Sequence, residues 1–252
     1  MEGAFAAVVR SVQERWHAFN ERWRSATATL NAEASQAAPQ WSAMEGAGFS
    51  PAQGVPQCVP FGTVDVQPLT MVRTASNGAE AAFIERVPAS ALLPIALEFA
   101  GRGSLLVRHT PQRRADAMRL LNQVMLRIIT AVPPAKARFT IIDPVGLGQG
   151  FSAFMHLADA EPLLVSDKIW TEPRHFEQKP SDLTEHMENV IQKYLRNQYT
   201  TIAEYNDAAG EVAEPLRFLV IADFPASMTD LAASRLAGIV SAGAKCGVFT
   251  LI

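Results

Sequence analysis

Residues 139–144 read Phe-Thr-Ile-Ile-Asp-Pro, and residues 217–224 read Arg-Phe-Leu-Val-Ile-Ala-Asp-Phe. Each stretch contains a short apolar run that ends near an aspartate, as is typical of a strand buried on both faces. A third run, Cys-Gly-Val-Phe-Thr-Leu-Ile, occupies 246–252. Stretches with apolar residues at helical spacing lie between these runs, at 112–130, 182–205 and 228–241. Strands that alternate with helices predict an α/β domain with a mostly parallel sheet and helices on both faces.

Two shorter apolar runs complete the predicted sheet. Ser104–Val107 precedes the first of these helices, and Leu163–Val165 follows the strand at 138–142. The chain stops at Ile252, inside the last predicted strand and without a turn after it. We therefore expect the main domain to be truncated at its C-terminus and to belong to a longer protein.

The composition limits the class of protein. Of the 252 residues, 48% are hydrophobic, which is enough to bury a substantial core. With 22 Lys and Arg against 25 Asp and Glu, the net charge of -3 excludes a strongly basic nucleic-acid coat. The two cysteines, Cys58 and Cys246, are too few for a disulfide framework. No apolar run approaches the roughly 20 residues needed to span a bilayer, so we expect a cytoplasmic chain.

Residues 1–38 are predicted to form a helical arm. Large residues recur at alternating steps of four and three, which is the spacing of a coiled-coil seam. They are Phe5, Val9, Val12, Trp16, Phe19, Trp23, Ala26 and Leu30. A lone helix of this length is marginal in water, so the seam needs a covering surface. That surface is either a coiled-coil partner bound through residues 5–30 or the body of the chain itself.

A linker and a small β layer are predicted to follow the arm. Residues 39–60 contain four prolines and several glycines and read as a linker without regular structure. Residues 61–92 are predicted to form the β layer, and the main domain is predicted over 93–252. The layer has candidate strands at Phe61–Val66, Leu69–Thr74 and Ala81–Val87, with a turn at Asn77-Gly78.

Five segments of the main domain occur in a recognisable order. They are Ser-Leu-Leu-Val at 104–107, Phe-Thr-Ile-Ile-Asp-Pro at 139–144, Ile-Ala-Glu-Tyr-Asn at 202–206, the run at 217–224, and Leu236–Ile252. In this order the chain resembles the motor domain of the FtsK/SpoIIIE DNA translocases, in the FtsK-HerA branch of the P-loop ATPases. The resemblance implies a RecA-like sandwich, ATP and magnesium as cofactors, and double-stranded DNA as a partner. It also implies further ATPase domains in the same protein, or a homo-oligomeric ring.

The phosphate-binding loop of that family has the pattern G-x-x-x-x-G-K-[ST]. The aligned positions here are His109, Thr110, Pro111, Gln112, Arg113, Arg114, Ala115 and Asp116. Both glycines, the lysine and the hydroxyl residue are therefore missing, and Pro111 lacks a backbone amide. An ionised Asp116 about 4 Å from a phosphate charge would repel it by about 4 kcal/mol at an effective dielectric near 20.

The second phosphate-handling motif also departs from the family pattern. The family strand ends in Asp-Glu, which hold magnesium and position the attacking water. Ala222 and Asp223 stand at those positions. Shifting the alignment by one residue would give Asp223 the magnesium role, but Phe224 would then leave no second carboxylate beside it. Asp223 is the single candidate for a catalytic residue.

Two other features of the sequence, a glycine-rich loop and the histidines, are candidates for a binding site. Gly146, Gly148, Gln149 and Gly150 follow a predicted strand, but G-x-G-x-G is not the dinucleotide fingerprint. This loop is interpreted as a flexible connection or as a DNA- or partner-facing loop. The five histidines lack the spacing of a zinc site, and no metal centre is predicted from the chain's own residues.

These observations lead to one main hypothesis and two alternatives. The main hypothesis is a non-hydrolysing FtsK/SpoIIIE-like domain that has a structural or DNA-gripping role beside an intact motor. The first alternative is an active ATPase in which Arg113 or Arg114 replaces the lysine. The second is an interaction scaffold that uses the coiled-coil arm and does not bind DNA.

Overall fold

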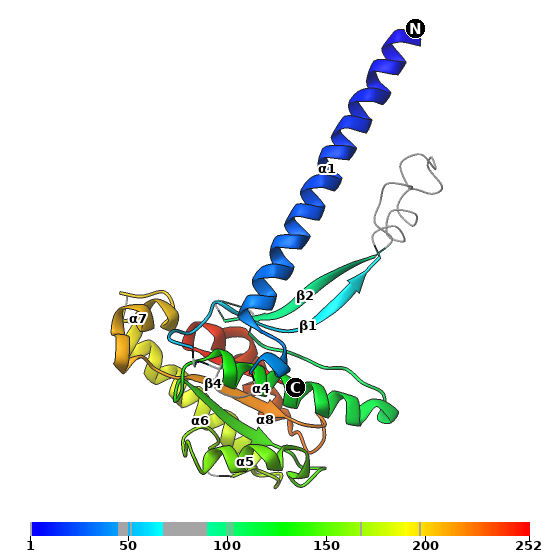
Figure 1. The fold of residues 1–252 in the computed structure, drawn as a ribbon. Coiled ribbons are helices and arrows are strands. Elements are labelled where there is room, and N and C mark those ends of the chain that lie inside the picture. The colour runs from blue at the N-terminus through cyan, green and yellow to red at the C-terminus, as the bar shows by residue number, and fades with distance from the viewer. Residues whose placement is uncertain are drawn as a thin grey trace. The chain divides into compact units, whose positions relative to one another are not determined.

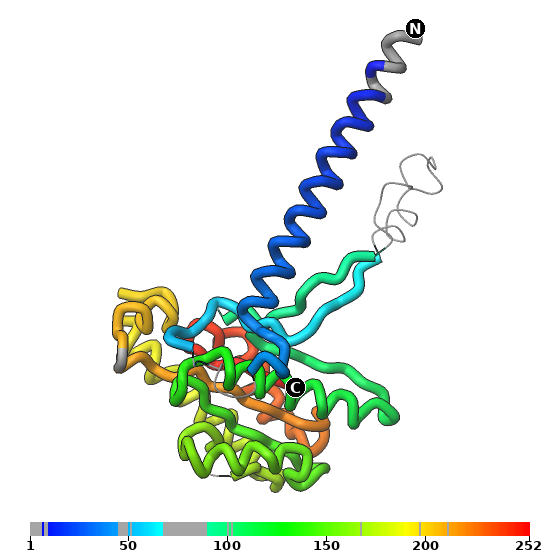
Figure 2. Tube along the Cα trace, viewed as in Figure 1, coloured from blue at the N-terminus to red at the C-terminus, as the bar shows by residue number. Residues whose placement is uncertain are grey.

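A computed structural model describes residues 2–44, 50, 52–67, 90–99, 101, 103–166, 168–196 and 198–252 (Figure 1). The chain divides into two compact units, which are described in turn below. The first comprises Met1–Gly48 and Pro60–Ala96, and the second comprises Phe49–Val59 and Leu97–Ile252. Figure 2 traces the path of the chain through both.

The first unit is built on one long helix. Helix α1 runs over Glu2–Ala37 and is followed by a 3-10 turn at Trp41–Met44. Near its carboxyl end, the Asn31 amide donates a hydrogen bond of 2.9 Å to the backbone oxygen of Leu92. Within the described residues, no helix combines the length and apolar character needed to cross a bilayer. Of the predicted seam, the side chains of Phe5 and Val9 lie outside the described residues.

The small sheet pairs two strands, and one of them was not predicted. Strand β1 covers Cys58–Val66 and pairs with β2, which covers Ala91–Glu98. Strand β2 lies outside the strands predicted for this layer, and it contains Pro94, a residue that is confined to edge strands. The other predicted strands of the layer, at 69–74 and 81–87 with their turn at Asn77-Gly78, lie outside the described residues.

A parallel sheet organises the second unit, as the sequence predicts. It has the order β3-β4-β5, with bounds of Ala137–Ile142, Leu216–Ile221 and Val248–Leu251. The two shorter predicted strands form single parallel bridges at the edges, Leu105 beside Leu251 and Val165 beside Phe139. Because all these segments run in one direction, their carboxyl ends meet at the same edge of the sheet.

Helices connect the strands. The longer ones are α4 (Arg114–Ala131), α5 (Ser152–Ala158), α6 (His175–Val190), α7 (Ile202–Ala209) and α8 (Asp230–Ala242). The single amphipathic stretch predicted over 182–205 is wrong. Helix α6 begins earlier and includes Pro180, and a π-helical turn at Ile191–Leu195 then ends it at Arg196, whose φ is 31°. Thr201 starts α7 afresh, because its hydroxyl accepts a hydrogen bond from the Glu204 amide.

Strand periodicity divides the core between the two faces of the sheet. On one face, Ile142, Leu219 and Ile221 pack with the apolar sides of α6 and α8. The alternate residues point to the other face, where the rings of Phe139, Phe218, Phe249 and Phe99 lie with neighbouring centroids 5.1 to 5.7 Å apart. Helix α4 lies in front of the sheet in Figure 1 and buries Leu121, Val124 and Ile128, among other residues.

A polar cluster lies where β3 and β4 begin. Arg138 and Arg217 occupy paired positions on these strands. Arg217 forms an ion pair of 3.1 Å with Glu214, and His186 of α6 lies 3.9 Å from the same carboxylate. Burial, assisted by the charges of Arg217 and Arg138, lowers the pKa of His186 to about 4. The folded protein therefore holds His186 neutral at pH values where an unfolded chain protonates it.

We predict that His186 makes the protein less stable as the pH falls from about 6.5 towards 4. In this window the unfolded chain binds a proton that the folded protein excludes, so stability is lost by up to about 1.4 kcal/mol per pH unit. The difference between wild type and His186→Gln in urea unfolding, measured from pH 7 to pH 4.5, isolates this contribution. Parallel stability curves for the two proteins would contradict the prediction.

Candidate nucleotide site

The phosphate-loop equivalents lie at the carboxyl edge of the parallel sheet. Leu105 is held beside β5 by bonds of 2.8 Å from its amide to the Thr250 oxygen and from the Ile252 amide to its own oxygen. The chain then leaves the sheet at Arg108 and enters a 3-10 turn at 111–113, after which α4 begins. Asp223 follows β4 at the same edge. The sheet therefore brings the two altered motifs together.

Arg114 and Asp223 form an ion pair across the site. The guanidinium Nε and Nη2 donate hydrogen bonds of 2.6 Å to the two carboxylate oxygens of Asp223. The Asp223 side chain is 12% exposed and that of Arg114 is 38% exposed, so the carboxylate is the more enclosed partner. The hydrogen bonds to Asp223 raise the pKa of Arg114, and the charges of Asp223 and Asp143 add to this effect. The strongest candidate for a metal-holding carboxylate is thus engaged by a cation of the chain itself.

The loop backbone does not form a phosphate nest. Such a nest needs successive amides turned inward by alternating right- and left-handed residues. Between 103 and 116, all of them described, no residue has a positive φ. Thr110 is extended, with φ -83° and ψ 160°, and Arg114 is already helical. Together with the missing lysine and Pro111, this backbone does not fit a triphosphate.

The Asp116 carboxylate lies on the exposed side of the helix start. It accepts a hydrogen bond of 2.9 Å from Arg113 and also pairs with Arg119. The bond from Arg113, together with the charges of Arg113 and Arg119, lowers its pKa and keeps it ionised. An ionised carboxylate therefore replaces the hydroxyl that would hold magnesium.

The remaining equivalents are spread around this edge. His109 lies with its Nδ1 2.9 Å from the Thr110 oxygen. Gln112 and Ala115 are exposed, whereas Ala222 is buried and its amide donates a bond of 2.9 Å to the Ile142 oxygen. Asp223 itself has a φ of 55°, a left-handed conformation that aspartate tolerates better than most residues. This turn directs the carboxylate towards α4.

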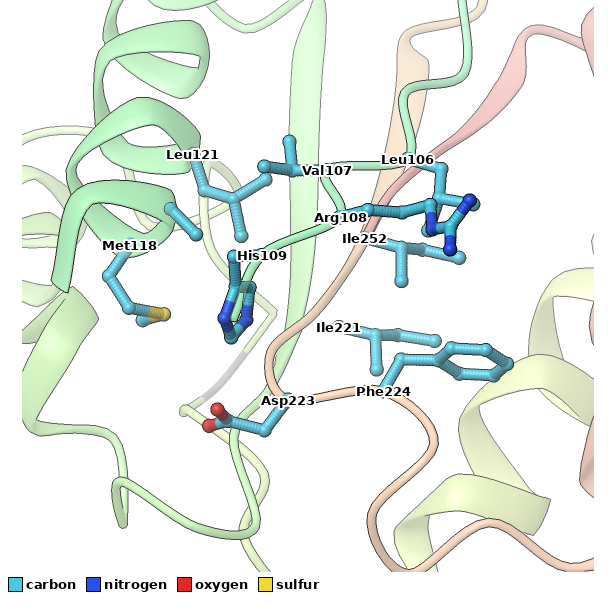
Figure 3. Close-up of a pocket in the computed structure, with 11 residues that line it drawn as sticks. Leu106, Val107, Arg108, His109, Met118, Leu121, Ile221, Asp223, Phe224 and Ile252 are labelled. Carbon is cyan, nitrogen blue, oxygen red and sulfur yellow. The ribbon is translucent and has the colours of Figure 1, made fainter. Parts of the chain in front are cut away.

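A hollow of about 350 Å³ lies beside the ion pair. Its lining is mixed: Figure 3 shows Met118, Leu121 and His109 on one side and Leu106, Arg108, Ile221, Phe224 and Ile252 on the other. Among the described residues, Asp223 is the one acidic residue of this lining. The sequence analysis did not predict Leu106 or Phe224 here, since apolar residues carry no phosphate-site signal.

The glycine loop after β3 is folded onto an aspartate. The buried Asp143 carboxylate accepts hydrogen bonds from the amides of Gly146 (2.7 Å) and Gly148 (3.1 Å). A β-carbon at Gly146 would lie 2.5 Å from an Asp143 oxygen, so that position requires glycine. The Asn122 amide also donates a bond of 2.9 Å to the Gly150 oxygen, while Gln149 is exposed. Asp143 thus has a structural role in holding this turn.

Comparison with known proteins identifies the fold. No protein-family model matches the chain, and no curated protein does. Among solved structures, it is similar to ATPases 2 and 3 of EssC from Geobacillus thermodenitrificans, with a TM-score of 0.54 and 18% identity over 81% of this chain. It is also similar to the cytoplasmic domain of the type VII secretion ATPase EccC from Thermomonospora curvata, with a TM-score of 0.51 and 18% identity over 81% of this chain.

At this level of identity the likeness concerns the fold alone. The chain has a mixed α/β fold, with a parallel sheet and helices, similar to that of these ATPase domains. It spans 34% of the EssC structure and 22% of the EccC structure.

We predict that Arg114→Ala lowers the free energy of unfolding by about 1–3 kcal/mol, because it leaves an enclosed carboxylate without its partner. Arg113→Ala is the matched control, since its side chain is 75% exposed and its pairing with Asp116 contributes less than about 1 kcal/mol. Urea unfolding of both variants tests this, and equal losses would contradict it. Adding Asp223→Ala to complete a double-mutant cycle measures the coupling directly.

Proposed function

We propose that this chain is a non-hydrolysing P-loop ATPase-like domain that acts as a structural module beside intact ATPase domains. The bidentate Arg114–Asp223 ion pair is the observation that carries the proposal. It neutralises the carboxylate that magnesium would need and places a guanidinium at the mouth of the loop. The loop backbone supports the same conclusion, because it lacks inward-turned amides.

The architecture of the neighbours supports a role beside other ATPase domains. The EssC structure is described as containing two ATPase domains, and this chain covers 34% of it. In a multi-ATPase protein, a domain without turnover can still contribute a packing surface to its neighbours. The active alternative, in which Arg113 or Arg114 replaces the lysine, is disfavoured because both guanidiniums are engaged by carboxylates.

We predict that the protein binds the fluorescent analogue mant-ATP with magnesium no tighter than about 1 mM, which corresponds to roughly -4 kcal/mol. Arg114→Ala removes the blocking guanidinium but leaves the loop without its nest, so this variant is also expected not to bind. Fluorescence titration and a phosphate-release assay, each with and without duplex DNA, test both proteins.

Two results would overturn the proposal. The first is magnesium-dependent turnover that Asp223→Ala abolishes and Asp116→Ala does not. The second is a gain of nucleotide binding by Arg114→Ala, which would make the ion pair a removable block on a working site. The active alternative would then replace the structural role.

Two kinds of substrate, DNA and protein, are candidates for the molecule that the whole multi-ATPase protein would move. The FtsK/SpoIIIE resemblance suggests double-stranded DNA, whereas EccC is named as a secretion ATPase, which suggests protein cargo. Four arginines at and before the start of α4 bear on this choice, namely Arg108, Arg113, Arg114 and Arg119. The last three are engaged by Asp116 or Asp223. Arginines already paired with carboxylates are poor phosphate ligands, and this favours a module that does not grip DNA itself.

We predict that the protein binds a 30-base-pair duplex only at the non-specific level of about 10⁻⁴–10⁻⁶ M at physiological salt. Arg108→Ala is expected to change this affinity no more than a substitution elsewhere on the surface. Anisotropy titrations at 50 and 200 mM salt provide the measurement. Nanomolar binding that falls by about 10³-fold or more between these salt concentrations would establish the DNA-gripping role instead.

A further inference from the structure

Helix α1 exposes an apolar seam along its described length. Val12, Phe19 and Leu30 are 43%, 48% and 48% exposed, although they occupy the core positions of the heptad pattern. Trp16 and Trp23 lie on the same line, and the Trp16 ring stacks on Phe19 with centroids 5.6 Å apart. A row of aromatic and aliphatic side chains at this spacing is suited to interdigitate with another helix.

A hollow lies along the seam and has charge on one side. It measures about 770 Å³ and is lined by Val12, Arg15, Trp16, Ala18, Phe19 and Arg22. Four of these residues are apolar, and the two arginines flank them. Amphipathic helices dock through their apolar faces, and charges beside the seam set the choice of partner.

The two arginines form a regular cationic flank. Arg15 and Arg22 are seven residues apart and both occupy the position just before a tryptophan of the seam. Neither has an ion pair among the described residues, whereas Arg24 on another face pairs with Glu21 at 2.8 Å. The opposite flank carries the uncharged residues Gln13, Asn20 and Thr27, of which Asn20 is 4% exposed, so the charge beside the seam lies on the arginine flank.

A second copy of this helix does not complement that flank. In a parallel pair, each flanking position meets the residue five places further along the partner helix. Arg15 would then face Asn20, and Arg22 would face Thr27, neither of which is charged. An antiparallel pair would place the arginine flanks against each other, which is repulsive. Self-association therefore leaves both guanidiniums without a carboxylate.

We propose that residues 12–30 of α1 dock an amphipathic helix of a different polypeptide segment, one that carries Glu or Asp at seven-residue spacing beside its apolar seam. The aromatic floor supplies apolar area, and the two arginines select for acidic residues and fix the register. This inference goes beyond the proposed function, because it depends on no property of the nucleotide site. It concerns the second alternative for the chain, an interaction scaffold, and assigns the interaction to the arm alone.

The test uses the full chain and two synthetic 28-residue heptad peptides with leucine at both seam positions. One peptide carries glutamate at the flanking positions and the other carries lysine. We expect the glutamate peptide to bind at least about 10-fold more tightly in anisotropy titrations, an advantage that salt reduces. The double variant Arg15→Glu with Arg22→Glu should reverse the preference. The control variant Arg10→Glu with Arg24→Glu, altered on another face, should keep it.

Three outcomes would overturn the proposal. Equal binding of both peptides would show that charge does not select the partner, and absence of binding by either would show that the seam is not a docking surface. A dimer of the chain alone, seen by sedimentation and lost in Phe19→Glu, would assign the surface to a second copy. Circular dichroism of each variant verifies that the helix is retained.

Discussion

An enclosed carboxylate at the edge of a parallel sheet needs hydrogen-bond donors or a cation beside it, and in this protein the Arg114 guanidinium supplies both to Asp223. The constraint follows from the sheet. The parallel register of β3, β4 and β5 brings the carboxyl ends of all strands to one edge, so loops far apart in the sequence meet there. In a P-loop ATPase this edge collects phosphate and metal. In the present chain the same geometry collects two side chains of opposite charge, which form an ion pair at this edge.

Several features of the structure could be predicted from local sequence. The runs ending at Asp143 and near Asp223 are strands because they are rich in β-branched and aromatic residues, with Thr140 as the one polar residue inside them. The departures of 109–116 from the phosphate-loop pattern can be read directly. The break at Arg196 could not be predicted, since apolar periodicity continues through it and the interruption is a backbone event. Strand β2 could not be predicted in the same way, because it contains Pro94, a residue that is unfavourable in most strands and is tolerated in an edge strand.

The ion pair itself was also beyond sequence reasoning. Arg114 and Asp223 are 109 residues apart, and either could have pointed to solvent. Only the left-handed turn at Asp223, together with the helix start at Arg114, brings the groups into contact. The sequence analysis considered Arg114 as a possible substitute for the missing lysine, whereas the structure gives it an internal partner. The arm presents the opposite case, because the heptad spacing alone predicts which residues lie beside its seam.

The mutual neutralisation of Arg114 and Asp223 also limits how such a domain can change. Replacing Arg114 with glycine, as the phosphate-loop pattern requires, would leave the Asp223 carboxylate without its cation. Removing Asp223 first would discard the candidate carboxylate for holding magnesium. Each of these single substitutions is therefore expected to lower the stability of the protein without producing nucleotide binding. The ion pair thus disfavours the single substitutions that would lead towards a nucleotide-binding loop.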